Sequence, residues 1–168
     1  MSLSRTLLSE LDHENASTRK LIELVPDARF AWRPHPKSWT VGELAAHLSS
    51  LPTWITRILD ATEFDLAPIL GTRFEVPARW GLADVLARFD SNWESARGAI
   101  ARASDADLER PWTLKRGSSV LGTMPRIAAL RSFVMSHAIH HRGQLTVYLR
   151  LLDVPLPGIY GPTADAPL

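Results

Sequence analysis

The sequence contains no cysteine among its 168 residues. This absence excludes disulfide bonds, a thiolate nucleophile supplied by the protein itself, and zinc or iron–sulfur sites built on cysteine ligands. Any metal site in this chain would have to use nitrogen and oxygen ligands. A reaction that needs a thiol would likewise have to obtain it from a small molecule.

The sequence also lacks a long apolar run and a region of one charge sign. No hydrophobic stretch approaches the length that spans a bilayer, and the first residues, MSLSRTLLSELDHENAS, show a helical repeat with acidic residues instead of a signal peptide. The formal net charge is +1, with basic and acidic residues interleaved along the chain. We therefore expect a cytoplasmic protein that binds neither a membrane nor nucleic acid.

Hydrophobic residues make up 45% of the chain, which is enough to bury a core without crosslinks. The length is typical of one domain, so residues 1–168 are expected to fold as a single unit. Apolar residues recur with the period of an amphipathic helix in four segments, and no segment alternates as a half-buried strand does. The predicted fold class is all-α.

Capping residues and prolines mark the ends of the predicted helices. The second helix begins after Thr40 and Glu43, which form the pattern of a capping box, and Pro52 predicts a kink or break within it. The segment SDADLERPWTLKRGSSVLG is expected to be a loop or to hold a short hairpin. The other three helices are predicted at about residues 3–25, 82–103 and 123–152.

Three histidines lie close together in the fourth predicted helix, within the stretch SHAIHHRGQL at residues 136–145. With about 100° of rotation per residue, His141 lies about 40° from His137, and His140 lies about 60° away on the other side. Arg142 is predicted to lie in the opposite arc, and His140 at the margin of the buried face. The side shared by His137 and His141 is predicted to be buried with Leu130, Phe133, Val134, Tyr148, Leu151 and Leu152.

A buried histidine pair four residues apart has two interpretations. A single core imidazole usually finds a carbonyl or hydroxyl partner and has no further role. Two such groups are more readily buried when a cation accepts both lone pairs, although H-x-x-x-H lacks the glutamate of the metalloprotease motif H-E-x-x-H. A third ligand would favour the metal site. His47 is the candidate, because it shares one face of the second predicted helix with Leu44, Leu51 and Trp54.

Three imidazoles from two facing helices can cover one face of a divalent ion and leave other positions open to water or substrate. An open site is the layout of a catalytic metal, since structural sites are normally closed. His47, His137 and His141 are therefore the predicted metal ligands, and His140 is not. Glu43, one turn before His47, is either an outer contact of the metal site or the capping residue, and the cap is favoured.

The sequence resembles the DinB/YfiT-like family of metal-binding four-helix bundles over nearly its whole length. The resemblance rests on SWTVGELAAHL in the second helix, on H-x-x-x-H-R-G-Q from His137 to Gln144, and on the closing PLPGIYGPTADAP. It implies an up-down-down-up bundle, a homodimer, and a zinc, nickel or similar divalent ion at His47, His137 and His141. Relatives of this kind include thiol-dependent transferases and isomerases that use bacillithiol, mycothiol or glutathione, and others described as hydrolases. The six tryptophans, more than one core is expected to need, also favour the homodimer.

Three functions are open at this point, the first two acting on a small-molecule substrate. The first is a metal-dependent transferase in which the ion lowers the pKa of a low-molecular-weight thiol for attack on a small electrophile. Arg142, Arg33 or Arg73 could hold a cofactor carboxylate, although each could equally be a solvated charge. The second function is a hydrolase in which the ion activates water, and the third is a non-enzymatic metal-bound binding module. Trp54, which shares the face of His47, is a candidate for lining the pocket.

Overall fold

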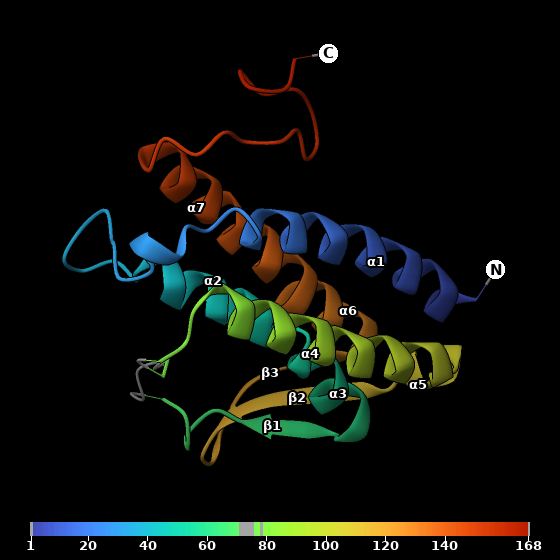
Figure 1. Ribbon diagram of the computed structural model, residues 1–168. Coiled ribbons are helices and arrows are strands. Elements are labelled where there is room, and N and C mark those ends of the chain that lie inside the picture. Colours follow the sequence, from blue (N-terminus) through green and yellow to red (C-terminus); the bar gives the residue numbers. More distant parts are fainter. Residues whose placement is uncertain (1, 71–75, 78, 168) are drawn as a thin grey trace.

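The computed structural model describes residues 2–70, 76–77 and 79–167, and its long helices form a four-helix bundle (Figure 1). The first three segments of the bundle are α1 (Leu3–Ile22), then α2 (Val41–Ser50) with α3 (Thr53–Asp60), then α4 (Leu82–Arg102). The fourth segment consists of α6 (Arg126–Leu130), a π-helical turn (Arg131–Ser136) and α7 (His137–Leu151). A 3₁₀ turn (Asp27–Arg29) and the short helix α5 (Asp105–Glu109) lie between these segments.

Contacts between the helices establish their directions. Asp12 of α1 pairs with Arg97 of α4, and Arg19 of α1 pairs with Asp90 of α4, so these two helices are antiparallel. In Figure 1, α2 and α3 run in the same direction as α4, and the fourth segment returns in the direction of α1. This is the expected up-down-down-up order.

The capping and proline signals of the second segment are confirmed. The backbone N–H of Thr40 donates to Glu43 Oε2 at 2.6 Å, and the backbone N–H of Glu43 donates to Thr40 Oγ1 at 3.0 Å. The helix then breaks at Pro52, which separates α2 from α3. The first helix ends at Ile22, three residues earlier than the expected Val25.

A small sheet makes the strict all-α prediction wrong. It consists of β1 (Glu63–Asp65), β2 (Pro111–Arg116) and β3 (Ser119–Pro125), with β1 parallel to β2 and β2 antiparallel to β3. The segment SDADLERPWTLKRGSSVLG was expected to be a loop or to hold a short hairpin, and β2 and β3 form such a hairpin. Its turn contains Gly117 at φ 57°, a conformation that glycine adopts without strain. Three-residue β1 is too short to show alternation, so its sequence could not reveal it.

The fourth segment differs from the single helix predicted over 123–152. Residues 123–125 belong to β3, and the π-helical turn interrupts the α-helix just before His137. A π turn contains one residue more than an α turn, so it rotates the following helix by about 100° relative to the expected phase. The faces of α7 are therefore not those that a continuous helix would present.

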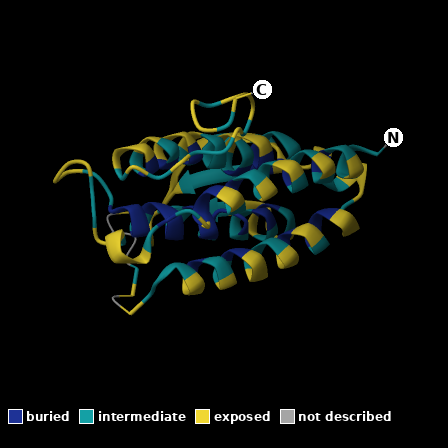
Figure 2. Ribbon diagram, turned by 45° about the horizontal axis from the view of Figure 1, so that its top comes forward, coloured by how far each residue is buried: buried dark blue, intermediate teal, exposed yellow. Residues whose placement is uncertain are grey.

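Buried residues gather between the helices, and exposed ones line their outer faces (Figure 2). The most enclosed helix is α2, in which seven of ten residues are buried. One core cluster surrounds Leu44, Leu48, Phe89 and Leu145, and a second surrounds Trp112 beneath the sheet. Within the described residues, no helix has both the length and the apolar character needed to cross a bilayer.

Candidate metal centre

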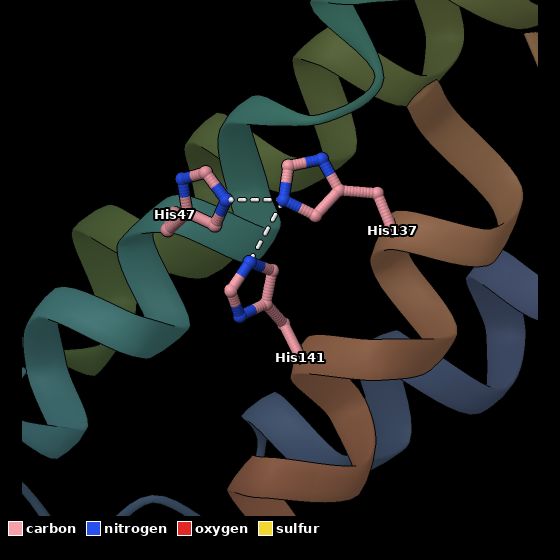
Figure 3. Close-up of side chains that lie close together, drawn as sticks. All are labelled: His47, His137 and His141. Carbon is pink, nitrogen blue, oxygen red and sulfur yellow. Dashed lines mark hydrogen bonds between the residues drawn. The ribbon is translucent and has the colours of Figure 1, made fainter. Parts of the chain in front are cut away.

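Three imidazole rings converge between α2 and α7 (Figure 3). The Nε2 atoms of His137 and His141 lie 2.8 Å apart, and Nε2 of His47 lies 3.4 Å from Nε2 of His137. One ring nitrogen of each histidine lies within 4.8 Å of the others, and among the described residues no other group of three histidine or acidic side chains does so. The structure thus brings together the three histidines selected from the sequence, which we name the candidate metal centre. Their role as ligands stays a prediction.

The Nε2 separations of 2.8 and 3.4 Å are close to those expected for ligands of one divalent ion. Imidazole nitrogens bound at about 2.0–2.1 Å to one tetrahedral or octahedral ion lie about 2.9–3.4 Å from each other. A hydrogen bond between two of the rings would use one lone pair, whereas a cation accepts all three. Three imidazole nitrogens within 4.8 Å of one another could therefore hold one divalent ion.

The electrostatic surroundings keep the three rings neutral. Burial, together with the neighbouring His141 and His137, lowers the pKa of His47 to about 3. Burial is also the main cause that lowers the pKa of His137 and of His141. Neutral imidazole is the form that binds a metal, so the lone pairs are available at neutral pH.

Two outer contacts orient the rings on α7. His141 Nδ1 lies 2.8 Å from Gln144 Oε1, an acceptor, so Nδ1 carries the proton and Nε2 presents its lone pair to the centre. The His137 ring bonds to the backbone of Phe133, and because this contact raises the pKa of His137, the acceptor is the carbonyl oxygen. Gln144 Nε2 also lies 3.1 Å from His140 Nε2, which places exposed His140 outside the centre.

The tryptophan beside the centre is Trp39, not Trp54. The Trp39 ring stacks on His141 at 5.5 Å between centroids and lies against His47 at 4.8 Å. Trp54 instead packs on Phe64 at 4.9 Å, in the second core cluster, so the prediction for Trp54 is wrong. Trp39 directly precedes Thr40, the N-cap residue of α2. An apolar side chain at this position often packs onto the first turns of the helix, and this signal could have placed Trp39 near His47.

The sequence predicted that Arg142 lies on the side of the helix opposite the buried face. In the structure it is buried instead. Only 2% of its surface is exposed, and it donates to the Glu14 carbonyl at 2.9 Å and to Glu14 Oε2 at 2.5 Å. Tyr160, from the carboxyl-terminal tail, bonds to the same two side chains. The charge of Arg142 is therefore already paired, and the interpretation of Arg142 as a cofactor-holding residue is wrong.

The π turn explains why the predicted position of Arg142 was wrong. It also determines how exposed the candidate metal centre is. Leu151, predicted to face the core, is 57% exposed, while Arg142 and Leu145 are buried. The buried face of α7 is thus rotated away from the predicted one. His137 and His141 lie at its margin and are half-buried, so the candidate metal centre is not sealed in the core.

The remaining residues predicted for the site have other roles or positions. Glu43 is the capping residue, as favoured, and Arg33 Nη2 lies 3.9 Å from its Oε2. Glu43 is not one of the three grouped ligand residues, and its alternative role as an outer contact of the metal site stays a prediction. Arg73 lies outside the described residues.

The fold and the centre define a helical-bundle protein with three imidazoles able to hold a divalent ion. The chain belongs to the DinB superfamily, whose sequence model matches residues 10–145 and so includes all three histidines. It is also similar to the uncharacterized protein YrdA of Bacillus subtilis (strain 168), with 28% identity over 162 residues that cover 94% of this chain and 88% of YrdA.

Solved structures share the fold. The DinB-like protein YjoA of Bacillus subtilis matches with a TM-score of 0.69 and 19% identity over 92% of this chain and 97% of its own. A DinB-like protein of Bacillus cereus matches with a TM-score of 0.67 and 21% identity over 91% and 95% of the two chains. YfiT of Bacillus subtilis, described as a probable metal-dependent hydrolase with an unusual four-helix bundle topology, matches with a TM-score of 0.66 and 17% identity over 90% and 88%.

Proposed function

We propose that the protein is a metal-dependent enzyme whose divalent ion is held by His47, His137 and His141. The observation that carries this proposal is the convergence of three neutral, half-buried imidazoles, with Nε2 distances of 2.8 and 3.4 Å. Three ligands leave coordination positions for other molecules, and the half-exposed rings of α7 leave a path to them. A bound ion would act as a Lewis acid that lowers the pKa of a thiol or a water molecule placed at such a position.

The residues of the chain would orient the site and restrict its access. Gln144 and the Phe133 carbonyl hold the tautomers of His141 and His137, so that Nε2 of each faces the centre. Trp39 covers His141 and His47 from one side. A substrate would therefore approach from a side that Trp39 does not cover.

A small thiol is the nucleophile that the site favours. The group of potential ligand atoms contains no carboxylate, and Glu43, the acidic residue nearest in sequence to His47, is held by its cap. A thiol of pKa about 8.5 ionises far more readily than water of pKa about 15.7, so it needs less help from a base. Its sulfur would form a bond to an electrophilic carbon, the leaving group would depart with its electron pair, and the thiol proton would pass to solvent.

Hydrolysis is the second candidate, and one specific observation favours it. YfiT, which shares this fold, is described as a probable metal-dependent hydrolase. Water as the nucleophile would use the same three histidines. The bound ion would lower the pKa of that water so that hydroxide forms near neutral pH.

One set of assays separates these functions. Protein purified without a histidine tag and loaded with zinc or nickel would be given 1-chloro-2,4-dinitrobenzene with glutathione, bacillithiol or mycothiol, and separately an activated ester without thiol. We expect metal-dependent conjugation with at least one thiol, lost in His137→Ala and kept in His140→Ala. Ester cleavage without thiol would favour the hydrolase. A loaded protein that shows neither reaction would contradict both and leave the metal-bound binding module.

A further inference from the structure

A pocket separate from the candidate metal centre lies at the end of the bundle where α3 and α4 end and α6 begins. Its volume is about 440 Å³, and it shares no residue with the candidate metal centre. Arg102, Arg110 and Arg126 line it together with apolar Leu59 and Ala99. We call this site the arginine pocket.

The fold brings these three arginines together from separate elements. Arg110 precedes β2 and Arg126 follows β3, and the pairing of these strands places the two residues side by side, with Arg126 N donating to Arg110 O at 2.9 Å. Arg102 reaches the pocket from the last turn of α4. The pairing of β2 with β3 and the end of α4 therefore bring three arginine side chains to one pocket.

Arg126 is the least expected of the three, because its side chain is buried and forms no salt bridge within 4 Å with a described carboxylate, although its charge helps to lower the pKa of nearby Asp107. It is 5% exposed, its Nη2 donates to the Ala61 carbonyl at 3.0 Å, and its Nε is buried with no partner. Arg126 is one of the residues that line the pocket. The carboxylate that interacts with this buried guanidinium, Asp107, is shared with Arg110, so an anion in the pocket would add the counter-charge that Arg126 lacks at contact distance.

The acidic residues at the pocket do not supply that counter-charge fully. Asp107 pairs with Arg110 at 3.3 Å, and its other oxygen accepts from the backbone N–H and hydroxyl of Ser104 at the start of α5. Asp60, also at the pocket, is exposed and forms no ion pair with a described arginine. Three guanidinium groups therefore face two carboxylates, of which one is already engaged.

We infer that the arginine pocket binds the phosphate group of a small molecule or inorganic phosphate itself. Guanidinium groups present several N–H donors in one plane and match the oxygens of a phosphate. The volume exceeds that of a bare ion, and Leu59 and Ala99 offer an apolar wall to the body of a phosphate ester. This inference does not depend on the metal, since the two sites share no residue.

Calorimetric titration at low ionic strength tests the inference. Inorganic phosphate and glycerol phosphate would be added separately to the metal-free and the metal-loaded protein. We expect saturable binding of one phosphate per chain in both forms. Tighter binding of glycerol phosphate would assign the pocket to an ester, and equal binding would assign it to the free ion. Absence of saturable binding would overturn the inference.

Matched variants locate the binding. Arg102→Gln, an exposed substitution that should leave folding intact, is expected to weaken phosphate binding by about 10-fold or more, the loss of one charge-assisted contact. Arg126→Gln should weaken it further if the variant folds. Arg116→Gln removes the same charge from an exposed arginine outside the pocket and should change affinity by less than about two-fold. Equal affinity of Arg102→Gln and the parent, or equal weakening by Arg116→Gln, would overturn the assignment.

Discussion

The Nε2 atoms of His137 and His141, one turn apart on α7, lie 2.8 Å from each other, and His47 of α2 adds a third nitrogen 3.4 Å from the first. With Nδ1 of His137 and His141 protonated, the Nε2 atoms present converging lone pairs, which a cation can accept together. The contact between His137 and His141 is therefore the basis of the predictions on metal binding.

Removing any one of the three histidines should lower metal affinity by orders of magnitude. His47→Ala, His137→Ala and His141→Ala each delete a ligand, whereas His140→Ala deletes an exposed ring outside the centre and should keep near-stoichiometric metal. Elemental analysis of the four purified variants measures this. Metal lost from His140→Ala but kept in His137→Ala or His141→Ala would contradict the assignment.

Gln144 should act on the metal through His141. Gln144→Ala removes the acceptor that lies 2.8 Å from His141 Nδ1, and loss of such an outer contact typically weakens metal binding about 10- to 100-fold. Gln144→Glu keeps an acceptor and should retain affinity. Competition titration with a chelator measures both variants. An unchanged affinity in Gln144→Ala would show that His141 needs no orienting partner.

Acid should destabilise the metal-free protein in a definite pH range. Burial and the neighbouring His141 and His137 lower the pKa of His47 from 6.5 to about 3, so between these values the unfolded chain binds the proton and the folded one does not. The contribution of His47 to stability is present above about pH 6.5 and is lost as the pH falls toward 3. Thermal unfolding from about pH 7 to 4 should show a decreasing Tm.

His47→Asn provides the control for the pH experiment, because it removes the titrating group. Paired carboxylates such as Asp90 also lose stability in acid, so the informative quantity is the difference between parent and variant. The decrease in Tm should be smaller in His47→Asn. Identical pH profiles would show that the burial of His47 does not contribute to the acid sensitivity.

The buried pair between Arg142 and Glu14 should be important for stability. Glu14→Ala leaves the Arg142 guanidinium, whose side chain is 3% exposed, without its counter-charge, a change that costs about 3–5 kcal/mol. Glu10→Ala breaks an exposed pair with Arg131 on the same two helical segments and should cost about 0–1 kcal/mol. Urea unfolding measures both. Equal effects would mean that burial does not distinguish the two pairs.

The homodimer stays a prediction, with a changed structural basis. All six tryptophans are at least half-buried within one chain, so they do not form the exposed surface that the sequence suggested. Val147 and Leu151, one turn apart on the outer face of α7, are each 57% exposed and are the better interface candidates. Light scattering at micromolar concentration should give the dimer mass, and Val147→Lys should shift it toward the monomer. A monomer mass for the parent chain would contradict the prediction.

The local signals of the sequence were sufficient for much of the fold. The capping box of Thr40 and Glu43 and the break at Pro52 depend on a few neighbouring residues, and the structure confirms both. The spacing of His137 and His141 likewise places both rings on one side of a helix, whatever the phase of that helix. The sequence could therefore select the three histidines that the structure brings together.

Tertiary structure decided the features that depend on distant residues. β1 has three residues and pairs with β2 about 50 positions later, so no local pattern marks it. The π turn before His137 adds one residue to the helical repeat, and only packing against α1 and α2 shows that Arg142 lies inside and Leu151 outside. Helical periodicity fixes relative angles along an uninterrupted helix. The face that becomes buried is chosen by the neighbouring helices, because their apolar surfaces determine where α7 excludes water.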